Sequence, residues 1–427
     1  MSAHRWTAEV VVVGAGAIGA ATALELAGRG HEVLVLERGG GWAAECSWGN
    51  AGLVCPSHAG PFATRADLGN AARWMTRPDS PLGIAPEPAL AGFLTRLLAS
   101  TRPSVHRRVL AASRAMCLDA LEGHRRLAEA HGTGLQQVGL LDTYETPERM
   151  QAATAAAAEH RSRGLRPEVL DDTAVRALEP ALGAQTVGGV LYPDEAHCDP
   201  VSFVEAVGGA ALTAGVRLET GTDVLSLTPD ATGCTLETTS GTVRAGRVVV
   251  AAGTASGRLV APLGTSVCLR GGKGYAVDLA AEGRDVPVRP FMLQESRVAV
   301  TPLGDRLRLA GTMQFTAADM SIDRRRVAGI RGPAARLLPG WADATVVSVW
   351  AGLRPCTPDG LPLLGWVDEH QKVALSSGHA MLGLTLAPLA AEQAADLFEG
   401  KPVAYAEHLR VDRFALGRGR RRPASAV

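Results

Sequence analysis

Residues 10–38 read VVVVGAGAIGAATALELAGRGHEVLVLER, and this stretch decides the fold. It begins with four valines, which are typical of a buried strand, and residues 31–36 form a second apolar run. Between the two runs, the alanines and leucines from about residue 17 to residue 28 predict a helix. A strand, a tight turn, a helix and a second strand that ends at an acidic residue are together the parts of a dinucleotide-binding unit.

Three glycines in this stretch have the spacing G-x-G-x-x-G. Gly14 permits the tight turn, Gly16 lets a pyrophosphate approach the backbone because it has no Cβ, and Gly19 lets the helix pack close to the strand. The helix N-terminus offers free N–H groups to phosphates, and Glu37 is placed to accept hydrogen bonds from a ribose. The alternative is a glycine-rich turn in an ordinary parallel sheet. We expect an ADP-containing dinucleotide, bound by Gly14, Gly16, Ala17, Ile18, Gly19, Glu37 and Arg38.

The bulk composition excludes several classes of protein. The 427 residues, 46% of them hydrophobic, are enough for two domains with full cores. The formal net charge of zero and the 4% of aromatic residues argue against a nucleic-acid partner. The seven cysteines are scattered without a C-x-x-C pair, so we expect neither disulfides nor structural zinc, as in a reducing cytoplasm. Asp194, Glu195 and His197 lie close in sequence, but without a second set of ligands we expect a solvated loop and no metal.

No run of about 18 apolar residues is present, so the sequence predicts no transmembrane helix. Residues 418–422, RGRRR, form a basic cluster near the C-terminus. This cluster is either a solvated terminus or a weak contact with anionic lipid. We therefore expect a cytoplasmic protein, with peripheral contact at the inner face of the membrane as the alternative.

The rest of the chain predicts an α/β protein with two domains. Residues 90–100 and 106–131 have helical spacing and predict a helical insertion, while most of residues 267–349 alternate with period two and predict an antiparallel sheet. Residues 247–253 and 373–379 predict strands that return to the dinucleotide unit. We expect a discontinuous nucleotide-binding domain of residues 1–65, 165–265 and 350–427, and a substrate domain of residues 66–164 and 266–349.

Several later segments carry a family resemblance. Residues 248–253, VVVAAG, look like the second signature strand of FAD proteins, and residues 352–365, GLRPCTPDGLPLLG, together with 377–388, SGHAMLGLTLAP, resemble the FAD-dependent D-amino-acid oxidase superfamily. Residues 47–52, SWGNAG, with the KGY of 273–275, are most similar to the bacterial D-amino-acid dehydrogenases of that superfamily. The resemblance covers nearly the whole chain. It implies a Rossmann-like FAD-binding domain and a second substrate domain built on an antiparallel sheet with a helical insertion.

The resemblance also implies which residues contact FAD. It places residues 47 and 50–52 beside the ribityl chain and the pyrimidine, Val224 beside the adenine, and a helix that begins near Thr385 with its N-terminus toward the flavin N1–C2=O edge. The local alternatives are a plain Asn-Ala-Gly turn, an ordinary strand valine, and Thr385 as a simple N-cap. The expected contacts are Ser47, Asn50, Ala51, Gly52, Val224, Ala252, Gly253, Gly378, His379, Gly383, Leu384 and Thr385.

Two residues are candidate catalytic residues. The planar guanidinium of Arg354 matches a carboxylate, and the resemblance implies that it holds the substrate carboxylate over the flavin. Tyr275 is expected to hydrogen-bond the same carboxylate, the alternative being a tyrosine at the edge of the core. His58 and His379 are interpreted as local hydrogen-bonding residues and not as bases.

The implied activity is oxidation of the CH–NH2 group of a D-amino acid to an imino acid, and then to a keto acid and ammonia, by hydride transfer from Cα to flavin N5. The electron acceptor is a quinone, another carrier or O2. The alternatives are an O2-using oxidase, a dehydrogenase of an N-substituted or cyclic amino acid of the sarcosine, proline or hydroxyproline type, and a flavin-bearing subunit of a larger complex.

Overall fold

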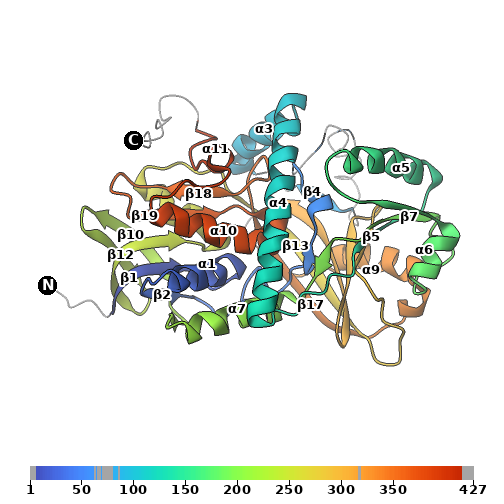
Figure 1. Cartoon of the computed structure of the whole chain (residues 1–427), viewed down its shortest axis with the longest axis horizontal. Helices are drawn as coiled ribbons and strands as arrows, with labels where there is room; N and C mark the ends of the chain where they lie inside the picture. The colour runs from blue at the N-terminus through green and yellow to red at the C-terminus, as the bar shows by residue number, and fades with distance from the viewer. Residues whose placement is uncertain are drawn as a thin grey trace.

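The computed structural model describes residues 6–61, 64, 69, 80–84, 87–315 and 319–415. These residues form two lobes side by side, one around a sheet of eight strands and one around a sheet of nine (Figure 1). Between the lobes lies the long helix α4 (Pro103–His131). The α/β class predicted from the sequence is confirmed.

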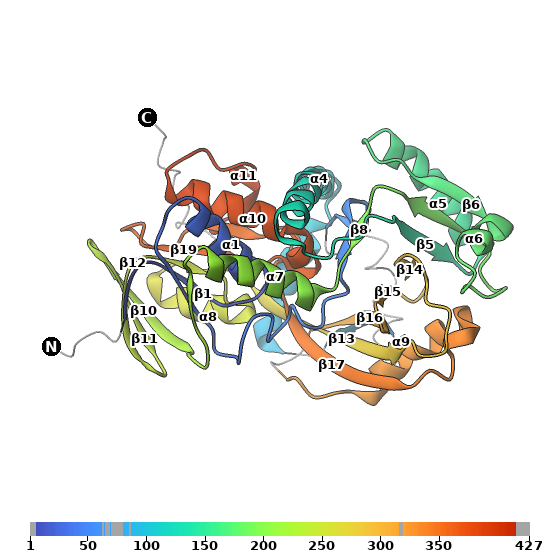
Figure 2. The same cartoon turned by 60° about the horizontal axis from the view of Figure 1, so that its bottom comes forward.

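The first sheet is built on the dinucleotide-binding unit. Strand β1 (Trp6–Val13) pairs in parallel with β2 (Val33–Leu36) on one side and with β12 (Gly241–Val250) on the other. The valines of β1 are buried on both faces, as expected for a central parallel strand. Helices α1 (Ala17–Gly28) and α10 (Gly383–Phe398) lie on one side of this sheet (Figure 2). The remaining strands of the sheet are β9 (Arg217–Glu219), β10 (Val224–Asp230), β11 (Gly233–Thr238), β18 (Leu363–Trp366) and β19 (Val373–Ser377).

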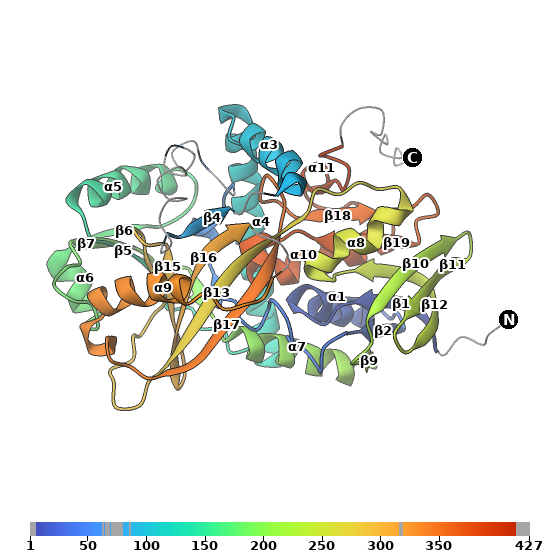
Figure 3. The same cartoon turned by 180° about the vertical axis from the view of Figure 1, so that it is seen from behind.

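The second sheet has the order β17-β13-β16-β15-β14-β5-β7-β6. Its long strands β13 (Arg270–Ala280), β16 (Arg306–Phe315) and β17 (Val346–Cys356) run from the second lobe to its boundary with the first (Figure 3). The shorter strands are β4 (Leu82–Ile84), which pairs with β16, and β5 (Leu140–Tyr144), β6 (Glu168–Asp171), β7 (Gly188–Tyr192), β14 (Phe291–Leu293) and β15 (Val298–Leu303).

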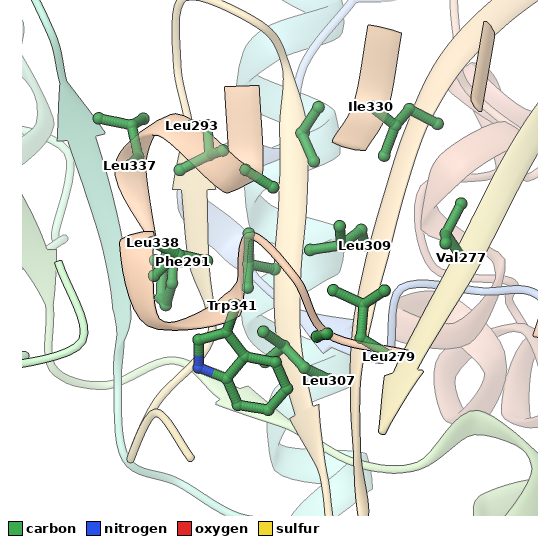
Figure 4. Close-up of a cluster of buried hydrophobic side chains, with 14 of the residues drawn as sticks. Val277, Leu279, Phe291, Leu293, Leu307, Leu309, Ile330, Leu337, Leu338 and Trp341 are labelled. Carbon is green, nitrogen blue, oxygen red and sulfur yellow. The ribbon is translucent and has the colours of Figure 1, made fainter. Parts of the chain in front are cut away.

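One face of the second sheet is closed by an apolar core. Side chains of β13 and β16, such as Val277 and Leu309, pack against Ile330 and Leu337 of α9 (Arg324–Leu337) and against Trp341 (Figure 4). The alternation of the strands turns their other side chains toward the first lobe. The side chains of the second sheet that face the boundary between the lobes therefore come from the face opposite the apolar core.

Helix α4 packs on the first lobe. Helix α4 packs through Val109 and Met116 against Leu386 and Leu389 of α10, so the expected helical insertion covers that helix. The other helices are α3 (Ala91–Ser100), α5 (Pro147–Arg161), α6 (Asp172–Leu178), α7 (Pro200–Thr213), α8 (Ser256–Val260) and α11 (Ala406–Leu409). Short 3-10 turns are η1 (Pro56–His58), η2 (Pro88–Leu90), η3 (Gly253–Ala255), η4 (Ala261–Leu263), η5 (Pro339–Trp341) and η6 (Ala380–Leu382).

Two details differ from the sequence-based expectations. The strand expected at 247–253 begins earlier, because β12 starts at Gly241 and pairs with β11 at one end and with β19 at the other. Strands β6 and β7 fall within the range expected for the nucleotide-binding domain, yet they pair in the second sheet. Nothing local signals this membership, because the partner of β7 is β5, far away in sequence. The domain boundaries themselves remain a proposal.

Two membrane-related expectations have different outcomes. Within the described ranges, no helix is long and apolar enough to cross a membrane. The basic cluster at 418–422 lies outside the described residues.

Candidate active site

A cavity of about 470 Å³ lies where the two sheets meet. Its walls come from the turn between β1 and α1, the end of β2, the loop of residues 45–50, the end of β12, and residues 376–384. Leu353 and Pro355 of β17 add a wall from the second sheet. The volume falls in the range of about 300–1,000 Å³ that is typical of ligand pockets.

The glycine turn forms the cavity end nearest β1. Gly14 has φ +106°, and a Cβ there would lie 2.7 Å from the carbonyl oxygen of Ala251. A Cβ on Gly19 would lie 1.8 Å from the oxygen of Gly14, so α1 sits directly on the turn. Gly16 is the N-cap of α1 and has no side-chain cap, and the N–H of Ala17 donates to Ser47 Oγ at 3.0 Å. Gly14 and Gly19 therefore have the steric roles expected from the spacing.

Glu37 lines the cavity at the end of β2 and is 6% exposed. Its Oε2 accepts from the N–H of Ala15 at 2.7 Å, and its Oε1 accepts from the N–H of Gly39 at 2.6 Å. A carboxylate has about four acceptor sites, so these two bonds leave capacity for a ligand hydroxyl. Arg38 also lines the cavity and pairs with Glu45 at 2.9 Å.

The loop after β2 contributes the next wall. Ser47 and Asn50 line the cavity, as does Cys46, which the sequence analysis did not single out. Asn50 Oδ1 accepts from the N–H of Gly52 at 2.8 Å, and a Cβ on Gly52 would lie 2.3 Å from the oxygen of Cys198. Gly52 and Ala51 are not among the lining residues, and Gly52 is needed for the shape of the loop.

Val224, expected beside the adenine, is the first residue of β10, while Ala252 and Gly253 follow the end of β12. Val224, Ala252 and Gly253 line the cavity together with Thr222 and Asp223. The last two were missed, although their position directly before Val224 was a usable signal.

The C-terminal segment closes the opposite wall. His379, Gly383 and Leu384 line the cavity, and burial lowers the pKa of His379 to about 3. Ser376 also lines it, with a buried Oγ that has no hydrogen-bond partner. Gly378 is not among the lining residues, and a Cβ there would lie 2.7 Å from the Thr357 side chain.

Thr385 is not the N-cap of α10. Helix α10 begins at Gly383 with Leu382 as its N-cap, so the N-cap interpretation of Thr385 is wrong. It lies in the first turn of α10, and its Oγ1 donates to the carbonyl oxygen of Leu53 in β3 (Leu53–Val54) at 3.0 Å. Thr385 is not among the lining residues.

Arg354 lies on β17 between two residues that line the cavity. Its Nη1 donates to the carbonyl oxygen of Thr312 at 2.9 Å, and a Cβ on Gly274 would lie 1.9 Å from that nitrogen. The guanidinium therefore lies flat against the backbone of β13. Burial raises the pKa of Cys46 and the charge of Arg354 counteracts the rise, so Arg354 is close to the cavity loop.

Tyr275, the second candidate catalytic residue, lies on the opposite face of the second sheet. In the pairing of β13 with β17, Gly272 is opposite Arg354 and Tyr275 is opposite Ala351, so Tyr275 and Arg354 point to different sides. Tyr275 is buried in the core beside α9, and its hydroxyl donates to Gln314 Oε1 at 3.4 Å. The structure does not bring Tyr275 to the cavity, and its surroundings are those of a core tyrosine.

A buried polar cluster next to η1 was not predicted. His58 Nε2 lies 2.9 Å from Asp142 Oδ1, and Glu195 accepts from both the N–H and the Oγ of Ser57. Burial acts to lower the pKa of His58, but the charge and hydrogen bond of Asp142, with Glu195, raise it to about 9. Burial raises the pKa of Glu195 to about 7 despite His58 and Ser57.

The solvated loop expected at 194–197 is wrong for Glu195 and His197, which are both buried. The reason is the pairing of β8 (Ala196–His197) with β3, which carries them under η1 and α4. In the part of the chain that the structure describes, no group of three or more His, Cys, Asp or Glu could hold a metal ion.

Comparison with known proteins places the chain among flavoenzymes. Residues 9–397 match the family model of FAD-dependent oxidoreductases. The chain is 35% identical over 423 residues to a D-amino acid dehydrogenase of Paramagnetospirillum magneticum, which covers 95% of this chain and 99% of the relative. It is 34% identical over 432 residues to one of Cereibacter sphaeroides, covering 97% of each. The crystal structure of glycine oxidase from Geobacillus kaustophilus superposes with a TM-score of 0.75 at 26% identity, covering 96% of this chain and 99% of that one.

Proposed function

The chain belongs to the family of FAD-dependent oxidoreductases, and from this premise we propose that it oxidises D-amino acids whose carboxylate is held by Arg354. The relatives that are 34–35% identical over almost the whole chain are named D-amino acid dehydrogenases, which supports the substrate class. The observation that carries the proposal is the position of Arg354. It lies on β17 between Leu353 and Pro355, which line the cavity that begins at the dinucleotide-binding turn, although Arg354 itself is not among the lining residues.

The residues of the cavity fit FAD. The glycine turn keeps its shape because a Cβ on Gly14 would meet the Ala251 oxygen at 2.7 Å, and the N-terminus of α1, whose N-cap Gly16 has no side chain, is directed at the cavity. The buried Oγ of Ser376 has no protein partner on the opposite wall. When bound, FAD supplies the hydride acceptor.

We assign the cofactor-holding roles by position along the cavity. The backbone of Gly14 to Ile18 would hold the pyrophosphate, Glu37 the adenosine ribose, and Ser47 with Asn50 the ribityl side. The N-terminus of α10, at Gly383 and Leu384, would place partial positive charge beside the flavin ring. The contacts assigned to Gly52, Gly378 and Thr385 are replaced in this proposal by roles in shaping the walls.

Arg354 orients the substrate. The bond from Nη1 to Thr312 fixes the plane of the guanidinium, and its remaining N–H groups can form two parallel hydrogen bonds to a carboxylate. Holding the acid at one fixed point aligns Cα for transfer and lowers the entropic cost of reaction. No protein base is needed if the amine binds as the neutral species, so turnover should rise as the pH approaches the pKa of the substrate amine.

The substrate class is tested by anaerobic mixing of the purified yellow protein with matched pairs of D- and L-amino acids, alongside N-methyl and cyclic amino acids. Loss of the visible flavin absorption with primary D-amino acids is the expected result. Reduction by L-, N-methyl or cyclic substrates alone would overturn the proposal. Peroxide formation in air, with and without a quinone analogue, identifies the electron acceptor.

The role of Arg354 is tested by Arg354→Ala. Loss of a charge-assisted pair should cost about 1.5–3 kcal/mol, or about 10- to 150-fold in kcat/KM, while the flavin spectrum is retained. Arg217→Ala is the matched control, because Arg217 lies on β9 and pairs with Glu32. Equal turnover of the two variants would discard the role.

A further inference from the structure

A fully buried arginine ties the cavity loop to the second sheet. Arg308 of β16 donates from Nε and Nη2 to the two carboxylate oxygens of Asp278 on β13, at 2.8 and 2.9 Å. Its Nη1 donates to the carbonyl oxygens of Trp48 and Asn50, at 2.8 and 3.0 Å. The guanidinium therefore joins two strands of the sheet to a loop that belongs to the other lobe.

A second donor acts on the same loop. Thr301 of β15 is fully buried, and its Oγ1 donates to the carbonyl oxygen of Ala51 at 2.7 Å. The Arg308 guanidinium also lies 5.2 Å from the centre of the Trp48 ring. Three carbonyl groups within residues 48–51 thus accept hydrogen bonds from the second sheet, and none of these bonds comes from the first.

The ion pair is built to hold its geometry. Asp278 also accepts from Ser348 Oγ at 3.1 Å, and Arg306 Nε lies 3.4 Å from the same carboxylate. A buried charge is costly unless it is paired and hydrogen-bonded, so the carboxylate and the guanidinium fix each other. Lysine could not replace Arg308, because it lacks the planar fork that serves the carboxylate and the loop at once.

The loop in turn reaches the cofactor cavity. Cys46, Ser47 and Asn50 line it, and Ser47 Oγ accepts from the N–H of Ala17 in the first turn of α1. The carbonyl groups of Trp48, Asn50 and Ala51 face the second sheet, while the side chains of Cys46, Ser47 and Asn50 line the cavity.

We propose that Arg308 and Thr301 are positioning residues that hold the loop of residues 48–51. Through them the second sheet sets the FAD affinity and the flavin midpoint potential. This inference rests on the FAD cavity of the proposed function, but not on the identity of the substrate. It makes the second sheet part of the cofactor site without any contact between those two side chains and the cofactor.

The test compares two substitutions that remove the same kind of bond. Thr301→Val removes the hydroxyl that holds Ala51. Thr143→Val, in β5 of the same sheet, removes a buried hydroxyl that donates to the Met292 oxygen at 3.0 Å. We expect Thr301→Val to raise the dissociation constant for FAD about two- to tenfold and to shift the midpoint potential of the bound flavin. Thr143→Val should change neither quantity. Equal effects of the two, or wild-type FAD affinity in both, would overturn the proposal.

Arg308→Lys provides a second measurement, with circular dichroism of the apoprotein as a check on folding. It should weaken FAD binding more than Thr301→Val does, and it should lower kcat with little change in KM, because Arg354 is not on the loop. Unchanged FAD affinity in a folded Arg308→Lys protein contradicts the inference. All FAD measurements are made without an amino acid, so a wild-type protein that binds FAD but is not reduced by amino acids would refute the proposed function alone.

Discussion

At the scale of single residues, the site depends on glycines, whose missing Cβ atoms leave room for larger side chains. Arg354 lies flat on β13 only because Gly274 has no Cβ. The ring of Trp350, four residues earlier on the same strand, also lies against glycines. A Cβ on Gly352 would lie 1.8 Å from this ring, and a Cβ on Gly49 would lie 1.9 Å from it. Glycines on this face of the second sheet therefore decide where the large side chains near the cavity lie.

Gly274→Ala should displace the guanidinium of Arg354 without altering its charge. The added Cβ would lie 1.9 Å from Nη1, and this flexible end of the side chain can move, so the fold should survive. We expect kcat/KM for the amino acid to fall at least tenfold while FAD affinity stays unchanged. Gly271→Ala on the same strand is the control, because its Cβ would meet Leu353 at 3.3 Å, near ordinary contact. Wild-type kcat/KM in Gly274→Ala would show that the position of Arg354 does not matter.

The ion pair of His58 and Asp142 should make stability depend on pH. The pKa of His58 rises from 6.5 to about 9 on folding, so its stabilising contribution is complete below pH 6.5 and is lost as the pH rises through 9. The shift corresponds to about 3 kcal/mol at most. Urea unfolding of the wild-type protein and of His58→Gln is measured at pH 6.5 and at pH 9. The free energy of unfolding should fall between these pH values for the wild type but not for the variant.

The control for this measurement is His370→Gln, at an exposed loop position. It should lose as much stability between the two pH values as the wild type does. If the stability of His58→Gln depends on pH as that of the wild type does, His58 is not the group responsible.

At the scale of elements, the unit β1–α1–β2 follows from local sequence. The valine run, the three glycines and Glu37 each have the structural place expected of them, because a strand, a turn and a helix that are adjacent in sequence need no distant partner to be recognised. Helix α10 shows the limit of this approach. Its existence was predicted, but its start at Gly383 moved Thr385 from a cap to a buried contact with Leu53.

The contact between α1 and the turn can be tested with two glycines of the same helix. In Gly19→Ala the Cβ would lie 1.8 Å from the oxygen of Gly14, a backbone atom that cannot move aside. We expect at least about 1–3 kcal/mol of lost stability and loss of FAD binding. Gly28→Ala meets nothing within 4 Å and should gain about 0.5–1 kcal/mol. Thermal unfolding and FAD titration measure both, and equal stability of the two variants would contradict the packing described.

At the scale of the whole molecule, the cavity exists because two sheets built from interleaved segments meet. The antiparallel sheet was predicted from period-two alternation, but alternation alone does not say which face becomes the core. Tyr275 was expected to bind the same carboxylate as Arg354, with a tyrosine at the edge of the core as the alternative, and it lies among Val277 and Leu279 in the core. The burial of Glu195 likewise depends on the pairing of β8 with β3, whose residues are far apart in sequence. Such long-range pairings leave no local pattern to read.

The most direct test of the account is a crystal structure of the FAD-loaded protein with an unreactive carboxylate analogue of a D-amino acid. We expect FAD to extend through the cavity from Glu37 to Gly383, with both carboxylate oxygens within hydrogen-bond distance of the Arg354 guanidinium. A carboxylate held by another residue, or FAD bound outside this cavity, would contradict it.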